Sequence, residues 1–67
     1  MTSSELGDYI LELYDELEDV NPGAALNFGE LYPQLSLSGS EWLDFCSQKS
    51  ARILVNELLD ELAELEI

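Results

Sequence analysis

Residues 12–19 read E-L-Y-D-E-L-E-D, and residues 57–64 read E-L-L-D-E-L-A-E. Five of the eight positions are identical, and a sixth is acidic in both copies. Around each copy, apolar residues recur at intervals of four, three, four and three. They are Leu6, Ile10, Leu13, Leu17 and Val20 in the first copy, and Ala51, Val55, Leu58, Leu62 and Leu65 in the second. This spacing places each set on one stripe of an α-helix, so the repeat predicts two amphipathic helices.

The acidic residues of both copies fall on the same flank of these stripes. With the apolar residues at heptad positions a and d, the acids take positions c, f and g. They are Glu12, Asp15, Glu16 and Asp19 in the first helix, and Glu57, Asp60, Glu61 and Glu64 in the second. If the two helices pack antiparallel, both flanks lie on the same side of the pair. We therefore expect one acidic face, formed by these eight residues, to bind a partner.

Helix start and stop signals divide residues 1–67 into one small all-α domain. Thr2 and Glu5 have the spacing of a capping box, which predicts a first helix that begins at about residues 2–4 and ends at about 19–20. Pro22 then favours a short helix or a few 3₁₀ turns within about 22–32, lying across the helical hairpin as a lid. The predicted fold is a three- to four-helix bundle with the first and last helices antiparallel.

A second capping-box spacing occurs at Ser38 and Glu41. No Gly or Pro follows them, so one continuous helix over residues 39–65 is allowed. However, the apolar residues before residue 47 point to the opposite side from those after residue 51, at 100° per residue. This change of phase predicts a break or sharp kink at 47–50, with Ser50 as the cap of a new helix.

The charge of the chain excludes several kinds of partner. There are 15 acidic residues, two basic residues and no His, which gives a net charge of −13. Direct binding to nucleic acid or to an anionic membrane needs basic patches, and the chain has none. The expected partner is therefore a basic protein, and in particular one that binds nucleic acid. A chain this short buries only about 60% of its unfolded surface, so a homodimer or a bound partner would add stability.

The sequence offers little for catalysis or cofactor binding. Without His there is no Ser–His or Cys–His pair. Acids at regular helical intervals are typical of a solvated face, and Leu17 stands where an EF-hand loop needs an oxygen ligand. Lone Cys46 fits a reducing compartment, and neither a signal peptide nor a membrane-spanning run is present. We expect a cytoplasmic protein that is not an enzyme and binds no metal or cofactor.

Acids at c, f and g place one charge about every 5 Å along each helix. Each strand of a DNA duplex carries one phosphate per about 3.4 Å. In composition, size and helical character the whole chain resembles the small acidic inhibitors encoded by phages and mobile elements, although no family motif supports this resemblance. It implies a nucleic-acid mimic, of the anti-CRISPR or transcription-inhibitor type, that blocks the basic groove of a host protein.

Two other interpretations remain open. The chain is alternatively a small helical adaptor, assembly factor or antitoxin-like module that binds through an apolar groove centred on Leu11, Tyr14 or Trp42. The acids would then serve only solubility. In the third interpretation the charge is an adaptation to a salty medium. Salt dependence separates them, because a mimic loses affinity steeply with salt, a groove binder loses it weakly, and a halophilic protein needs salt to fold.

Overall fold

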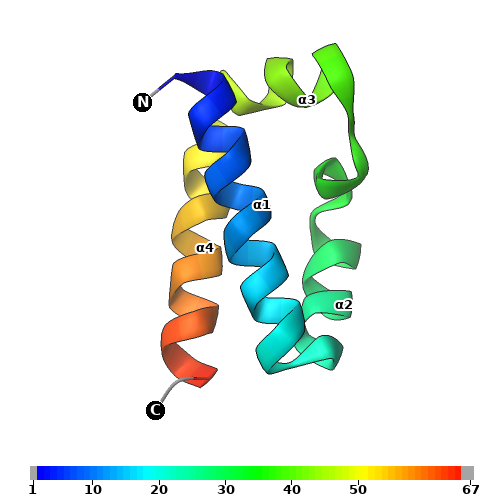
Figure 1. Ribbon diagram of the computed structural model, residues 1–67, viewed down its shortest axis with the longest axis vertical. Helices are drawn as coiled ribbons and strands as arrows, with labels where there is room; N and C mark the ends of the chain where they lie inside the picture. The colour runs from blue at the N-terminus through cyan, green and yellow to red at the C-terminus, as the bar shows by residue number, and fades with distance from the viewer. Residues whose placement is uncertain (1, 66–67) are drawn as a thin grey trace.

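Four α-helices follow one another along residues 2–65, the part of the chain that the computed structural model describes (Figure 1). They are α1 (Ser3–Val20), α2 (Pro22–Leu31), α3 (Gly39–Cys46) and α4 (Lys49–Leu65), with a 3₁₀ turn, η1 (Pro33–Ser36), between α2 and α3. This part of the chain contains no β-strand. The predicted all-α bundle is therefore confirmed, and so is the short helix expected within 22–32.

The first helix begins at the predicted capping box. The Thr2 backbone N–H donates to Glu5 Oε1, and the Glu5 N–H donates to Thr2 Oγ1, both at 3.2 Å. Hydrogen bonding of the Glu5 carboxylate with the Thr2 backbone N–H, and secondly with the Thr2 side chain, lowers the pKa of the Glu5 carboxyl group. At the other end, Asn21 separates α1 from α2, and its Oδ1 accepts a 3.2 Å hydrogen bond from the Ala24 N–H. Only one residue therefore joins the two helices.

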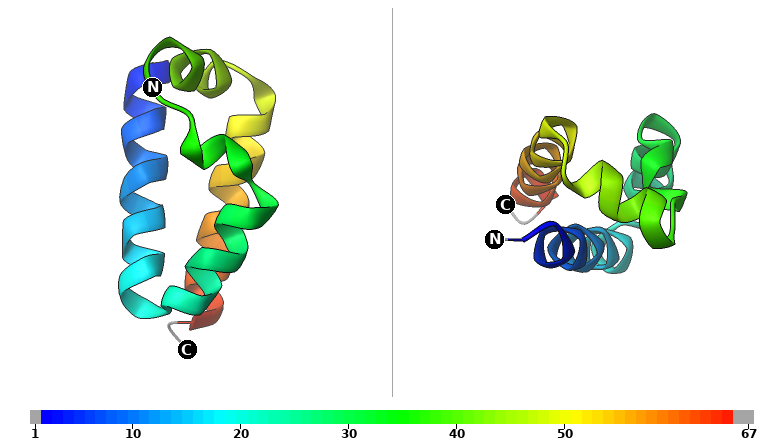
Figure 2. Two further views of the ribbon diagram at one scale, coloured as in Figure 1. Left: turned by 90° about the vertical axis from the view of Figure 1, so that its right-hand side faces the viewer. Right: turned by 90° about the horizontal axis from the view of Figure 1, so that it is seen from above.

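The first and last helices run parallel, so the predicted antiparallel packing is wrong. In Figures 1 and 2, α1 and α4 both run from the top of the molecule to the bottom. Leu6 and Tyr9 near the start of α1 accordingly line the same groove as Arg52 and Val55 near the start of α4. The reason lies in the connection. Instead of lying across a hairpin, α2 and η1 carry the chain back along α1, and α3 then crosses above, so α4 begins beside the start of α1 (Figure 1).

Most of each predicted apolar stripe is nevertheless buried. The core residues of α1 and α4 are Ile10, Leu13, Leu17, Ala51, Leu54, Val55, Leu58 and Leu62. Leu6 and Leu65 are partly buried against them, whereas Val20 is exposed. The periodicity thus identified the buried face of each helix, although it included Val20 and missed Leu54. It did not give the direction in which the two faces meet.

The predicted break between the last two helices is confirmed. Helix α3 ends at Cys46 and α4 begins at Lys49. The Ser47 hydroxyl donates to the Asp44 carbonyl oxygen at 2.7 Å, and such a bond competes with continuation of the helix. Ser50 lies inside α4, so its predicted capping role is wrong. The break lets the apolar side of α3 and that of α4 both face the core.

The second predicted capping box does not form. Ser38 precedes α3 as its N-cap residue, but its side chain makes no capping hydrogen bond. The next residue, Gly39, has a φ of +60°, a conformation that favours glycine. This backbone conformation turns the chain into α3 and explains why the Ser38 hydroxyl does not reach the N–H of Glu41.

Seen from above, α2 and α4 lie on the same side of α1, and α3 runs across the top of the bundle (Figure 2, right). The Tyr14 hydroxyl donates to the Ala25 carbonyl oxygen at 3.0 Å, which fixes α2 against α1. The α3 residues Trp42, Phe45 and Cys46 are buried in the core. Within residues 2–65, none of the helices has the length and apolar character needed to cross a bilayer.

Candidate acidic binding site

The eight predicted binding residues form two rows, one on each of the parallel helices. The α1 row consists of Glu12, Asp15, Glu16 and Asp19, and the α4 row of Glu57, Asp60, Glu61 and Glu64. All are exposed except Glu61, which is half-buried. Both rows are therefore accessible to a partner.

The two rows do not lie on one face. Packing two helices in parallel relates them by an axis along their length, so equivalent flanks point in opposite directions. The α1 row and the α4 row consequently occupy opposite sides of the helix pair, and the predicted single acidic face is wrong. The error follows directly from the direction of α4.

Parallel packing instead collects the acids at one end of the molecule. Both rows belong to the C-terminal halves of their helices, and those halves lie together at the bottom of Figure 1. We call this region the acidic end. It holds nine of the 15 acidic residues, namely Glu12, Asp15, Glu16, Glu18, Asp19, Glu57, Asp60, Glu61 and Glu64.

The electrostatics of the acidic end are one-sided. The only two cations of the chain, Lys49 and Arg52, lie at the start of α4, at the opposite end. The last turns of α1 and α4 carry no basic residue. A helix C-terminus also has a partial negative charge, about half an elementary charge. Two such termini therefore strengthen the negative potential of the acidic end, and the N-terminus of α2 offsets part of it.

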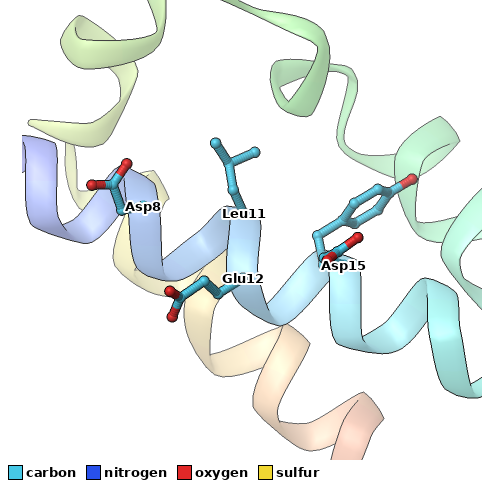
Figure 3. Close-up of a pocket in the computed structure, with 5 residues that line it drawn as sticks. Asp8, Leu11, Glu12 and Asp15 are labelled. Atoms are coloured by element: carbon cyan, nitrogen blue, oxygen red, sulfur yellow. The ribbon is translucent and has the colours of Figure 1, made fainter.

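The acids of α1 surround an exposed leucine (Figure 3). Leu11, Asp8, Glu12, Tyr14 and Asp15 line a shallow depression of about 570 Å³. In Figure 3 the Leu11 side chain lies between Asp8 and Asp15 and is directed away from Glu12. Because Tyr14 is bound to α2 and Trp42 is buried, Leu11 alone among the three predicted apolar contact residues is free for another chain.

A second surface feature escaped the sequence reasoning. Leu6, Tyr9, Arg52, Val55 and Asn56 line a groove of about 480 Å³ between α1 and α4. We call it the α1–α4 groove. Its residues bring the g flank of α1 beside the e flank of α4, as parallel helices require. The heptad pattern holds this information, but it is visible only once the two helices are taken as parallel.

Possible metal ligands and the one cysteine can be located in the described residues. No group of three or more Cys, Asp or Glu side chains within residues 2–65 is placed to hold a metal ion. Cys46 is 3% exposed, and burial, followed by the charge of Asp8, raises the pKa of its thiol. A protonated, buried thiol is a poor nucleophile. What the surface offers is charge and exposed apolar area.

A search with models of known protein families finds no match to this chain. Searches for similar curated proteins and for similar solved structures also find none.

Proposed function

We propose that the protein is a binding inhibitor, not an enzyme, and that its acidic end occupies the basic nucleic-acid groove of another protein. The observation that carries this proposal is the concentration of nine carboxylates, without any cation, on the C-terminal halves of α1 and α4. Local preferences oppose this arrangement, because acids in the last turns of a helix are unfavourable by about 0.3–1 kcal/mol each. Such departures from local rules are expected at functional sites.

The position of the two rows supports a concave partner. A flat basic surface would contact only one row, because the rows lie on opposite sides of the helix pair. A groove would contact both. Two rows of negative charge along the outside of a rod also reproduce, coarsely, the two phosphate strands of a duplex. The proposed partner is therefore a protein whose groove normally holds nucleic acid.

This proposal agrees with the class that the sequence resembles. Small acidic inhibitors of phages and mobile elements, including anti-CRISPR proteins and inhibitors of transcription, act in this way on host proteins in the cytoplasm. The single buried cysteine fits that reducing compartment.

A second candidate function is an adaptor or antitoxin-like module that binds through apolar side chains. The specific observation in its favour is the exposure of Leu26 (68%) and Leu31 (74%) on α2. Because they are five positions apart, they point about 140° apart around α2, so each offers a separate apolar contact on this short helix.

The experiment compares triple variants of the two rows. Glu12→Gln with Asp15→Asn and Asp19→Asn neutralises the α1 row, and Glu57→Gln with Asp60→Asn and Glu64→Gln neutralises the α4 row. Glu16 and Glu61 are left unchanged, because Glu16 lies on the same flank of α1 as the groove residue Tyr9, two turns further along, and Glu61 is half-buried. Asp8→Asn with Glu41→Gln and Asp44→Asn is the matched control, since it removes three carboxylates outside the acidic end.

Each protein is used to capture partners from a lysate of the native host, and the captured proteins are then challenged with duplex DNA, RNA and salt. We expect a nucleic-acid-binding protein that nucleic acid displaces and that both row variants bind much more weakly than the control does. Equal binding by all three variants, or simultaneous binding with nucleic acid in the groove, would sink the proposal. Salt-resistant capture that Leu26→Ser with Leu31→Ser abolishes would favour the adaptor function instead.

A further inference from the structure

Few side chains of residues 22–36, which form α2 and η1, reach the core. We call these residues the strap, because they return along α1 from its last turn to α3 (Figure 1). Ala25 and Phe28 are the only buried residues of the strap, and η1 has none. The shorter α3 buries three residues, and α4 buries five. The strap is therefore the part of the fold that apolar burial holds least for its length.

One hydrogen bond joins the strap to the other helices. It runs from the Tyr14 hydroxyl to the Ala25 carbonyl oxygen, at 3.0 Å. The other hydrogen bonds of the strap, as far as the structure describes the chain, lie within it or connect it to the flanking residues Asn21 and Leu37. The rings of Phe28 and Tyr32, with centroids 4.7 Å apart, also pair within the strap. These internal contacts persist when the strap separates from α1, so the strap can move as a unit.

A buried atom of the strap opposes its closed position. Gln34 Oε1 is buried and has no hydrogen-bond donor within residues 2–65. A buried acceptor without a donor raises the free energy of the folded chain. Because η1 packs against α2 and α3, separating it from α3 lets water reach its side chains. The closed position is therefore less favourable than its apolar contacts alone would make it.

The rest of the bundle can stay in place while the strap moves. The 18 residues of α1 span about 27 Å at 1.5 Å per residue, whereas residues 21–38 reach about 60 Å when extended. Movement of the strap therefore does not pull α3 off the top of the bundle. Helix α3 also has its own attachment, because Trp42 and Cys46 are buried and lie directly over Gly7 of α1.

We propose that the strap opens from α1 as a unit while α1, α3 and α4 stay packed together. Opening exposes Tyr14 on α1 and Phe28 on the strap, which are half-buried and buried in the closed position. The strap thus switches apolar side chains between a covered and an accessible state. Both acidic rows lie on α1 and α4, so opening leaves them in place. The proposal goes beyond the proposed function and does not depend on it.

Native-state hydrogen exchange of the full chain tests the proposal, measured by NMR at a series of low urea concentrations. The backbone N–H groups of residues 25–32 are hydrogen-bonded in α2 and at its end. We expect these N–H groups to share one protection factor, at least about tenfold lower than that of the core of α4. Their urea dependence should be smaller than that of α4 but not zero, because opening exposes only part of the surface that unfolding exposes.

Two other results of this measurement would overturn the proposal. Equal protection and equal urea dependence in α2 and α4 would mean that the strap leaves α1 only when the whole chain unfolds. Protection that falls gradually toward the ends of α2, with no urea dependence, would mean that this short helix frays without leaving α1. Both results come from the unmodified chain, so they do not require any variant to fold.

Two substitutions separate opening of the strap from global unfolding. Val55 lines the α1–α4 groove, so its contacts remain when the strap opens and are lost only when the chain unfolds. Val55→Ala should lower the protection of α4 about fivefold or more and leave that of α2 unchanged. Tyr14→Phe removes the hydrogen bond to Ala25 and should lower the protection of α2 about two- to tenfold. Equal losses in α2 and α4 for Val55→Ala would contradict independent opening.

A third substitution tests the unpaired acceptor. Gln34→Met keeps the length of the side chain and removes its carbonyl oxygen, so the protection of α2 should rise. Gln48→Met is the matched control, because it makes the same change at an exposed glutamine between α3 and α4, and it should leave α2 unchanged. Circular dichroism melting confirms that each variant is folded. Unchanged or lower protection of α2 in Gln34→Met would contradict the proposal.

Discussion

Gly7 shows how one missing side chain sets the position of a helix. It is buried on α1 where α3 crosses, and a Cβ at this position would lie 2.6 Å from Trp42 Nε1 and 3.1 Å from Cys46 Sγ. Real Cβ atoms do not approach so closely. Because residue 7 has no side chain, the Trp42 indole and the Cys46 thiol can pack directly against the α1 backbone.

Gly7→Ala should destabilise the fold although alanine is the better helix former. The higher helix propensity contributes about 1 kcal/mol, but forcing Trp42 and Cys46 aside costs about 1–3 kcal/mol and also displaces α3. Gly23→Ala is the control, because its Cβ would meet only Asn21 Oδ1, at 3.4 Å. Thermal unfolding should show a lower melting temperature for the first variant and an equal or higher one for the second. The opposite order would contradict the close contact at Gly7.

The buried thiol of Cys46 should respond to pH as a group whose pKa is raised by folding. Its stabilising contribution is complete below the ordinary thiol pKa of about 8.5 and is lost as the pH rises through the higher folded value. Iodoacetamide should alkylate it slowly at pH 8 in the folded protein and rapidly in urea, as mass spectrometry can measure. Rapid alkylation without denaturant would mean that Cys46 is not buried.

At the scale of the elements, the sequence was sufficient for each helix but not for their arrangement. The capping box at Thr2, the Asn21–Pro22 stop and the phase change near Ser47 predicted the bounds of α1 and the break before α4. Heptad spacing also identified the buried faces. It carries no information on direction, because one apolar stripe can meet another in either sense. The direction follows from the return of α2 and η1 along α1, a tertiary feature.

The phase of α4 can be tested with two neighbouring leucines. Leu58 is 0% exposed and Leu59 is 40% exposed. Leu58→Ala should lower the free energy of unfolding by about 2–5 kcal/mol, whereas Leu59→Ala should change it by only about 0.5 kcal/mol. Urea unfolding at a concentration where the chain is monomeric measures both. Similar losses for the two variants would show that α4 is rotated from the described position.

The direction of α4 can be tested by cross-linking in a Cys46→Ala background. Tyr9→Cys with Arg52→Cys places two thiols in the α1–α4 groove, so a short bis-maleimide should join them within one chain. Tyr9→Cys with Glu61→Cys is the control that antiparallel packing would bring together, because both residues lie on g flanks. Mass spectrometry of the monomer-sized product distinguishes the two. An intramolecular cross-link in the control pair, and none in the first, would restore antiparallel packing.

At the scale of the whole molecule, the direction of α4 relative to α1 determines where the acidic side chains lie. The identities of the acidic residues could be predicted from the sequence, and all eight are accessible. The location at which these residues gather could not be predicted, because it depends on whether α1 and α4 are parallel or antiparallel. The α1–α4 groove was missed for the same reason. Parallel packing gives the molecule an acidic end and places its two cations, Lys49 and Arg52, at the other end.

Moderate salt should stabilise the folded chain. Nine carboxylates at one end repel each other more strongly in the folded state than in the expanded one, and salt screens this repulsion. The melting temperature should rise between low salt and about 0.5 M NaCl. The control triple variant of Asp8, Glu41 and Asp44 should retain most of this rise, and a triple variant of either row should retain less. A flat or falling trend in the parent would contradict the crowding of charge at the acidic end.

The parallel helix pair also has a consequence for the folding rate. Single-residue and two-residue turns join α1 to α2 and α3 to α4, so these neighbours can meet early. The contact between α1 and α4 must instead wait until the whole of residues 21–48 has closed into a loop. Closing such a loop reduces the conformational entropy of the chain before the contact contributes any stabilising free energy. We therefore expect α1 and α4 to be the last elements to come into contact as the chain folds. These are the two helices that share the repeated sequence and that the sequence identifies most directly.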